Sequence, residues 1–191
     1  MSRGVSQKTK KLTVSALLSA LGVVMLLVGS LIEVLDLSMA ALASFFCIFA
    51  VIELGGAYPW LIFSVTSILS VIIMPQSMGG WFYLLFFGYY PIIKEKLERL
   101  KKPLAWLIKL IVLNTAMIVS VALAYFLFFG QKGGNLFDAF LYVFGGEGIG
   151  TYLAAAVYVA FNVVFVVYDI ALTRIISYYF FKLRSKFKLF R

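Results

Sequence analysis

Long apolar runs, separated by short polar or glycine-rich stretches, dominate the chain. A helix needs about 20 apolar residues to cross about 30 Å of hydrocarbon, so runs of this length predict membrane-spanning helices. The sequence predicts six such helices, over about 12–35, 39–54, 60–74, 79–93, 103–129 and 149–181. The fourth run contains Gly88 and Pro91, which predict a kinked or partly irregular helix.

Two further apolar segments need interpretation. The first run is much longer than the apolar region of a signal peptide, which has about 7–15 residues, so we interpret it as a retained helix. Residues 136–144 are apolar but too few to span a bilayer. A seventh crossing there would move the basic C-terminal tail to the other side, so we interpret this segment as an interfacial or re-entrant lid.

Composition supports this pattern. The chain has 191 residues, of which 63% are hydrophobic and only 13% charged. Its mean hydropathy is +1.03. A soluble domain is nearer half apolar and a quarter charged, and a disordered chain has low hydrophobicity. The expected fold class is therefore an all-α integral membrane protein, with a single transmembrane domain over residues 1–191.

Charge predicts the topology. Lys and Arg number 17 against 8 acidic residues, a net charge of +9. The basic residues cluster at the ends of apolar runs, so lipid headgroups and topology explain them better than a nucleic-acid partner does. With six crossings nearly all of them share one side of the bilayer. The excess of positive charge on the inner side then places both termini in the cytoplasm.

The available chemistry excludes several functions. The chain has no His, and its single Cys47 lies inside an apolar run, so we expect no metal site, no cofactor and no disulfide framework. It has no phosphate-binding G-x-x-x-x-G-K-[ST] loop. The charged Glu53, Asp169 and Arg174 are expected near helix ends, as snorkelling groups or structural pairs. We therefore expect neither an enzyme nor an ion-coupled pump.

A candidate binding site comes from aromatic and polar residues expected at the outer helix ends, together with two amides expected near the midplane. Aromatic bodies with a few polar groups suit a small-ligand pocket. An aromatic belt at the membrane interface, and an interhelical hydrogen bond between the amides, remain alternatives. The candidate substrate-binding residues are Glu33, Asp36, Trp81, Tyr83, Asn114, Tyr125, Glu147, Thr151, Tyr152 and Asn162.

A second candidate site is a strip of small residues near the start of the first helix. Ala16 and Ala20 are four residues apart, and Ser19 widens the strip. Small residues at this spacing let another helix approach closely. We therefore take Ala16, Ser19 and Ala20 as candidate partner-docking residues.

These features resemble the substrate-binding S components of energy-coupling factor (ECF) transporters. The resemblance is carried by six helices in under 200 residues, by both termini inside, and by Lys10–Leu21, which reads KKLTVSALLSAL. It implies capture of a vitamin or similar micronutrient near the outer face of a prokaryotic plasma membrane. It also implies a transmembrane coupling subunit with two ATPase subunits, on which Ala16 and Ala20 would dock.

Two other functions stay open. A non-transport scaffold, resembling the rod-shape-determining membrane proteins, would also use flat small-residue faces but would need no ligand pocket. A membrane enzyme would need a nucleophile or paired acids at one depth, for which Glu53, Asp169 and Ser or Tyr residues are the candidates. If the chain binds a ligand, the weakly charged outer pocket favours a flat, largely apolar one.

Overall fold

A computed structural model describes residues 2–126, 139–140 and 151–179 of the chain. These residues form helices and turns without strands, so the all-helical prediction is confirmed for them. The chain divides into two compact units: unit 1 comprises residues 1–101 and 179–191, and unit 2 comprises residues 102–178. The single domain expected over 1–191 stays a prediction.

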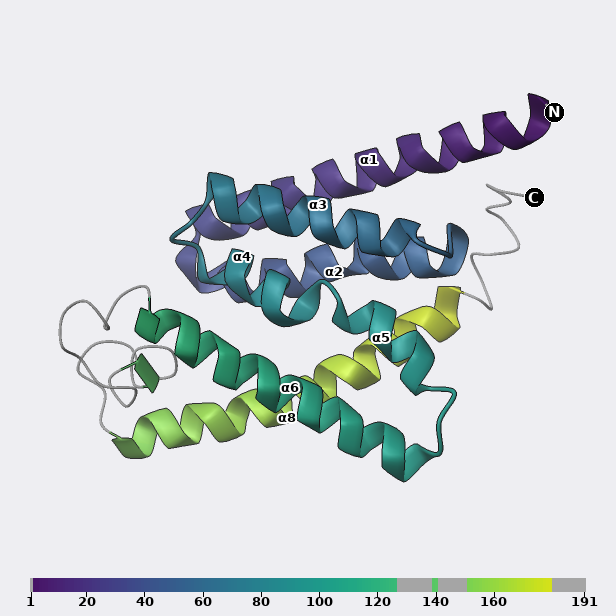
Figure 1. The fold of residues 1–191 in the computed structure, drawn as a ribbon. Coiled ribbons are helices and arrows are strands. Elements are labelled where there is room, and N and C mark those ends of the chain that lie inside the picture. Colours follow the sequence, from purple (N-terminus) through teal and green to yellow (C-terminus); the bar gives the residue numbers. More distant parts are fainter. Residues whose placement is uncertain (1, 127–138, 141–150, 180–191) are drawn as a thin grey trace. The chain divides into compact units, whose positions relative to one another are not determined.

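Unit 1 is a bundle of helices joined by short turns (Figure 1). Helix α1 packs on α2 and α3, and α2 also contacts α4, η2 and α5. Segment η1 is a 3₁₀ turn and η2 is π-helical. The elements are α1 (Ser2–Leu31), η1 (Glu33–Leu35), α2 (Asp36–Glu53), α3 (Tyr58–Ile73), α4 (Met78–Phe82), η2 (Tyr83–Phe87) and α5 (Tyr90–Leu97).

Unit 2 contains two long helices, α6 (Lys102–Ala124) and α8 (Thr151–Tyr178), which contact one another. Ala139 and Phe140 are also helical. The rest of the expected lid, residues 136–144, lies outside the described residues. The same holds for residues 127–129 of the fifth expected helix, and for residues 149–150 and 180–181 of the sixth.

The first helix differs from its expected bounds at both ends. The sequence places it over 12–35, but α1 begins at Ser2 and ends at Leu31. Apolar residues alone set the expected start, whereas the preceding polar residues contain no proline and continue the same helix. At the other end, Ile32, Val34 and Leu35 extend the apolar run into a 3₁₀ turn, where they stay exposed.

The irregular fourth helix is confirmed. Its residues form α4, then the π-helical η2, then a turn before α5, in which Pro91 occupies the first turn. The glycine within this stretch is closely packed, since a Cβ on Gly88 would lie 2.5 Å from Cδ2 of Phe63. Proline cannot donate the backbone bond that a continuous helix needs, so the chain restarts at α5.

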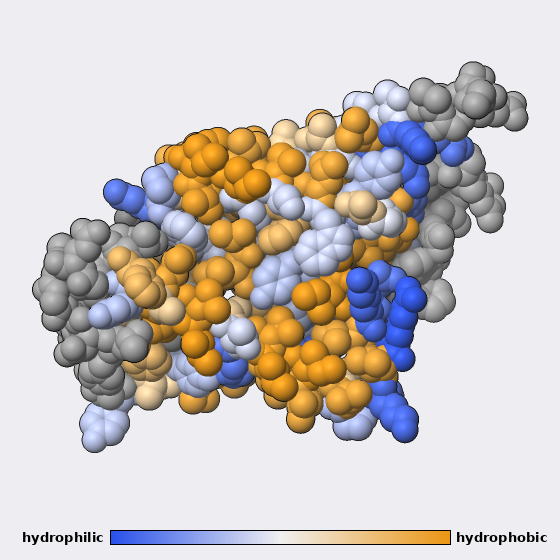
Figure 2. Space-filling view, in the orientation of Figure 1, coloured by the Kyte–Doolittle hydropathy of each residue, from blue (hydrophilic) through white to orange (hydrophobic). Residues whose placement is uncertain are grey.

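Four described helices are long and apolar enough to cross a membrane. They cover Gln7–Leu31, Asp36–Glu53, Lys102–Leu123 and Tyr152–Tyr178. Helix α3 is apolar but has only 16 residues. Apolar side chains cover most of the visible helix surface in Figure 2, and Leu17, Val24, Ile72 and Val163 are among the exposed ones. This surface supports a multi-pass membrane protein, because water would penalise it and lipid does not.

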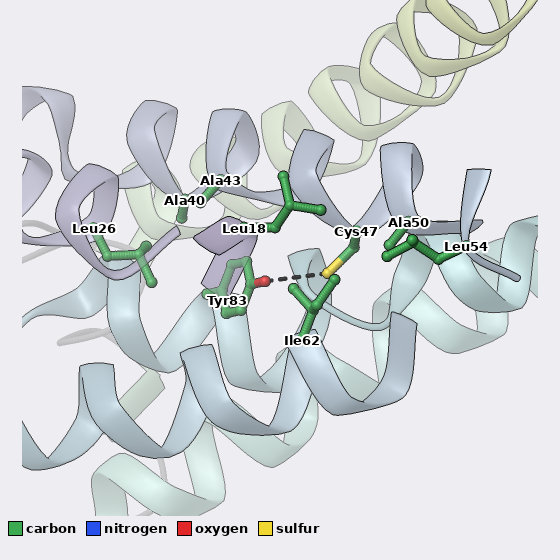
Figure 3. Close-up of a cluster of buried hydrophobic side chains, with 9 residues drawn as sticks. All are labelled: Leu18, Leu26, Ala40, Ala43, Cys47, Ala50, Leu54, Ile62 and Tyr83. Atoms are coloured by element: carbon green, nitrogen blue, oxygen red, sulfur yellow. Dashed lines mark hydrogen bonds between the residues drawn. The ribbon is translucent and has the colours of Figure 1, made fainter. Parts of the chain in front are cut away.

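Small side chains on α2 allow the close packing at the centre of unit 1. Ala40, Ala43, Cys47 and Ala50 recur at helical spacing and are fully buried. Leu18 and Leu26 of α1 and Ile62 of α3 complete this face with Tyr83, as Figure 3 shows. The sulfur of Cys47 lies 3.3 Å from the hydroxyl oxygen of Tyr83. Cys47 is therefore a core residue that faces a neighbouring element of unit 1.

Candidate functional site

The candidate substrate residues are divided between the two units. Glu33, Asp36, Trp81 and Tyr83 belong to unit 1, and Asn114, Tyr125, Thr151, Tyr152 and Asn162 belong to unit 2. Glu147 lies outside the described residues. Each unit therefore offers its own set of polar contacts, and the two sets are considered separately.

In unit 1, Asp36 links the start of α2 to the start of α4. Its side chain is buried and accepts a 2.7 Å hydrogen bond from the backbone N–H of Gly79. The hydroxyl of Ser77 donates to the same carboxylate, 2.9 Å from Oδ1. Ser77 also caps α4, since its Oγ accepts from the N–H of Gly80 at 3.2 Å. We call Asp36, Ser77 and Gly79 the Asp36 cluster.

The neighbouring aromatic candidates also have partners within unit 1. The indole N–H of Trp81 donates to the carbonyl oxygen of Pro75 at 2.8 Å. Tyr83 is fully buried against Cys47 in the core. Glu33 lies in η1, one turn before the Asp36 cluster along the chain. The structure thus places Asp36 and Tyr83 in positions that organise the bundle.

In unit 2, Asn114 of α6 meets Asn162 and Tyr158 of α8. The side-chain N–H of Asn114 donates to Oδ1 of Asn162 at 3.3 Å. The Tyr158 hydroxyl donates to Oδ1 of Asn114. Asn162 in turn donates to the Tyr158 carbonyl oxygen, one helical turn earlier, at 3.0 Å. We call these three residues the Asn114 cluster. The interhelical hydrogen bond that the sequence left as an alternative is therefore present.

The Asn114 cluster is neutral, partly accessible and next to an aromatic ring. Asn114, Tyr158 and Asn162 are all half-buried. The ring of Phe140 lies 6.5 Å from that of Tyr158, centroid to centroid. Both N–H groups of Asn114 are used, since they donate to Asn162 and to the Leu110 carbonyl oxygen at 2.9 Å. An asparagine amide has two N–H donors and an oxygen with two lone pairs, so Asn162, which donates one and accepts one described bond, has the capacity to meet a ligand that carries both a donor and an acceptor.

The other unit 2 candidates do not join this cluster in the described contacts. Tyr125 follows the end of α6, and its ring contacts that of Phe126 at 5.8 Å. Thr151 is the first residue of α8. Tyr152 is 94% exposed, which places its ring on the outside of the helix. An exposed tyrosine at a helix end is typical of an interfacial aromatic belt.

Lys109, which the sequence pattern did not single out, forms a buried ion pair between α6 and α8. Its Nζ lies 2.9 Å from Oδ2 of Asp169, and the two side chains are 6% and 3% exposed. Trp106 adds a cation–π contact, with Nζ 5.2 Å from its ring centroid. Removing one partner of such a pair strands a buried charge and costs about 3–5 kcal/mol. The sequence did carry a signal for this pair, because Lys109 is a single lysine inside an apolar run and Asp169, already noted, could neutralise it.

The other charged residues noted in the sequence have different surroundings. Glu53, at the end of α2, accepts a 2.9 Å hydrogen bond from the hydroxyl of Tyr179. The ring of Tyr179 also contacts Phe49 edge-on, with centroids 6.1 Å apart. Arg174 is exposed on α8. The structural-pair interpretation is confirmed for Asp169, and Glu53 has a neutral partner instead of a charged one.

The small-residue strip on α1 has two faces. Ala16 and Ala20 are exposed, whereas Ser19 is 2% exposed. The hydroxyl of Ser19 donates to the Ser15 carbonyl oxygen, and its own carbonyl oxygen accepts from Thr66 of α3 at 3.4 Å. Ser19 therefore serves packing between α1 and α3 and does not share the outward face of Ala16 and Ala20.

No family model matches the chain, and no curated protein or solved structure does either. Within the described ranges, no group of three or more His, Cys, Asp or Glu residues could hold a metal ion. The Asn114 cluster and the exposed face of α1 are therefore the two candidate sites for binding and docking.

The Asp36 cluster predicts that Gly79→Ala destabilises unit 1 while Gly80→Ala does not. A Cβ on Gly79 would lie 2.6 Å from the Asp36 carbonyl oxygen and 2.8 Å from its Cγ. Overpacking of this kind costs about 1–3 kcal/mol. At Gly80 the nearest atom is Oγ of Ser70, at an ordinary 3.7 Å. Thermal unfolding in detergent should separate the two variants, and equal stability would contradict the tight contact.

Proposed function

We propose that the chain is the substrate-capture subunit of an ECF-type uptake transporter, binding a vitamin or similar micronutrient. The Asn114 cluster carries the proposal. It puts neutral, half-buried hydrogen-bonding groups between two helices, each long and apolar enough to span a bilayer. Polar groups inside such helices are costly in hydrocarbon, so a half-buried cluster of them is a candidate contact for a polar ligand as well as for the neighbouring helix.

The chemistry of the Asn114 cluster restricts the charge and the hydrogen-bonding groups of the proposed ligand. Two amides and one phenol carry no net charge. The Lys109–Asp169 pair close by is internally neutralised. A charged ligand would find no uncompensated partner among these groups, so we propose a neutral, planar ligand with at least one donor and one acceptor.

The proposed topology has six crossings and both termini in the cytoplasm. At one end of unit 1, Lys11 donates to the carbonyl oxygen of Leu54 at 2.8 Å, which ties the basic start of α1 to the turn after α2. The other end carries the acidic Asp36, bonded to Ser77 before α4. An excess of basic residues marks the cytoplasmic side, which supports placing the Lys11 end inside.

The exposed face of α1 would then meet the coupling subunit. Ala16 and Ala20 project no long side chain and lie about 1.4 and about 2.5 turns beyond Lys11. A flat face of this kind allows another helix to approach closely and to separate again, because no side chain interlocks with the partner.

A scaffold without a ligand is the second candidate. The hydrogen bond that Asn114 donates to Asn162 favours the scaffold, because a structural interhelical bond has the same geometry. Binding and scaffolding differ in their response to small molecules. A ligand at 100-fold excess over Kd stabilises its protein by about 2.7 kcal/mol, whereas a scaffold gains nothing.

The binding proposal predicts a thermal shift that depends on the Asn114 cluster. Purified protein is heated with a panel of vitamins and their precursors, and one neutral compound should raise the melting temperature. Asn162→Leu should weaken the affinity several-fold and so reduce the shift at a fixed ligand concentration, because it removes a hydrogen-bond partner worth about 0.5–1.5 kcal/mol. Thr115→Val, at an exposed position of α6, is the matched control and should keep the shift. An unchanged shift in Asn162→Leu would exclude this site.

The docking proposal predicts that Ala16→Trp abolishes association with the coupling module and leaves the ligand-induced thermal shift intact. The bulky ring would hold the partner helix away from α1. Affinity purification from the native host should recover a membrane subunit and two ATP-binding subunits with the unaltered chain and with the control variant, but not with Ala16→Trp. Leu17→Trp is the control, since Leu17 is already large and 61% exposed. Equal loss in both variants would contradict a specific role for Ala16.

A further inference from the structure

The pairing of α6 with α8 poses a physical problem for a protein in lipid. Both helices expose many apolar side chains, including Ile111 and Ile118 on α6 and Val159 and Val167 on α8. Lipid tails are as apolar as these side chains, so apolar contact alone does little to favour one alignment of the helices. Polar contacts have to discriminate the native register from its neighbours.

Two polar layers lie along the contact between these helices. The first is the Lys109–Asp169 ion pair, and the second is the Asn114 cluster. Lys109 precedes Asn114 by about 7.5 Å along α6, and Asp169 follows Asn162 by about 10.5 Å along α8. The order of contacts reverses between the helices, so they run antiparallel here. Phe165, which is 3% exposed, lies between the two polar positions of α8.

A slip of one helical turn would move each layer by about 5.4 Å. A displacement of that size would pull Nζ of Lys109 away from Oδ2 of Asp169, which are 2.9 Å apart in the native alignment, and would strain or break the ion pair. Slipped amides can find other carbonyl or hydroxyl partners, but a slipped lysine and aspartate remain charged in an apolar surrounding. The penalty for misalignment therefore comes mainly from the ionic layer.

We infer that the Lys109–Asp169 pair sets the register of α6 against α8 and thereby brings Asn114, Tyr158 and Asn162 together. Replacing a buried ion pair with apolar residues of similar size often leaves stability unchanged or higher. The ion pair therefore serves to align the helices. Two leucines in its place would hold the helices together without favouring one register.

Disulfide cross-linking in native membranes tests the register directly. In a Cys47→Ala background, cysteines replace Asn114 and Asn162, whose side chains are 3.3 Å apart. Two further pairs report slipped alignments, joining Asn114→Cys to Val166→Cys and Leu110→Cys to Asn162→Cys, each one turn away from the native pairing. With the ionic layer intact, the 114–162 pair should give the dominant product on mild oxidation.

The leucine pair Lys109→Leu/Asp169→Leu should accumulate in the membrane yet lower the ratio of 114–162 to slipped products several-fold. The reversed pair Lys109→Asp/Asp169→Lys should restore the native ratio, because opposite charges again meet. A leucine pair with the native ratio would overturn the inference, as would an inserted reversed pair that fails to restore it. If the leucine pair does not accumulate, the reversed pair decides alone. Cross-linking needs no ligand, so this result is independent of the proposed function.

Discussion

A charged or amide side chain within an apolar helix has to find its partner inside the protein, because hydrocarbon offers none. This constraint organises unit 2. Lys109 meets Asp169, and Asn114 meets Asn162 and Tyr158, across two helices that otherwise expose apolar surface. The ionic layer pairs opposite charges, whereas the half-buried amide layer contains both donors and acceptors. We propose that the amides contact the ligand, and we infer that the charges align the helices.

Unit 1 meets the same constraint with small side chains and local hydrogen bonds. Alanines and Cys47 on α2 let α1, α3 and η2 pack closely, while the hydroxyl of Ser19 bonds within its own helix. The Asp36 carboxylate is satisfied by Ser77 and Gly79, which ties two helix starts together. The result is a bundle with a closely packed centre, in which Ala16 and Ala20 of α1 stay exposed.

Much of the fold could be predicted from the sequence, because apolar run length and helix breakers act locally. Gly88 and Pro91 predicted the interruption that appears as η2 and the turn before α5. Side-chain partners could not be predicted in the same way, because they depend on which helix faces which. Tyr83 was expected near the outer helix ends, but it is buried against Cys47. Ser19 was grouped with Ala16 and Ala20, but its side chain faces the interior of unit 1. Lys109 was missed because its partner lies 60 residues away along the chain.

The central claim is that the Asn114 cluster holds a small neutral molecule. Native mass spectrometry of the intact protein, purified gently from its own membranes, tests this most directly. The account predicts a mass adduct of a few hundred daltons that is released at higher collision energy and identified as a neutral, planar micronutrient. The adduct should be depleted when Asn114 and Asn162 are both replaced by leucine. A protein that carries no adduct and takes up none from a nutrient-rich extract, or an adduct that persists in the leucine variant, would contradict it.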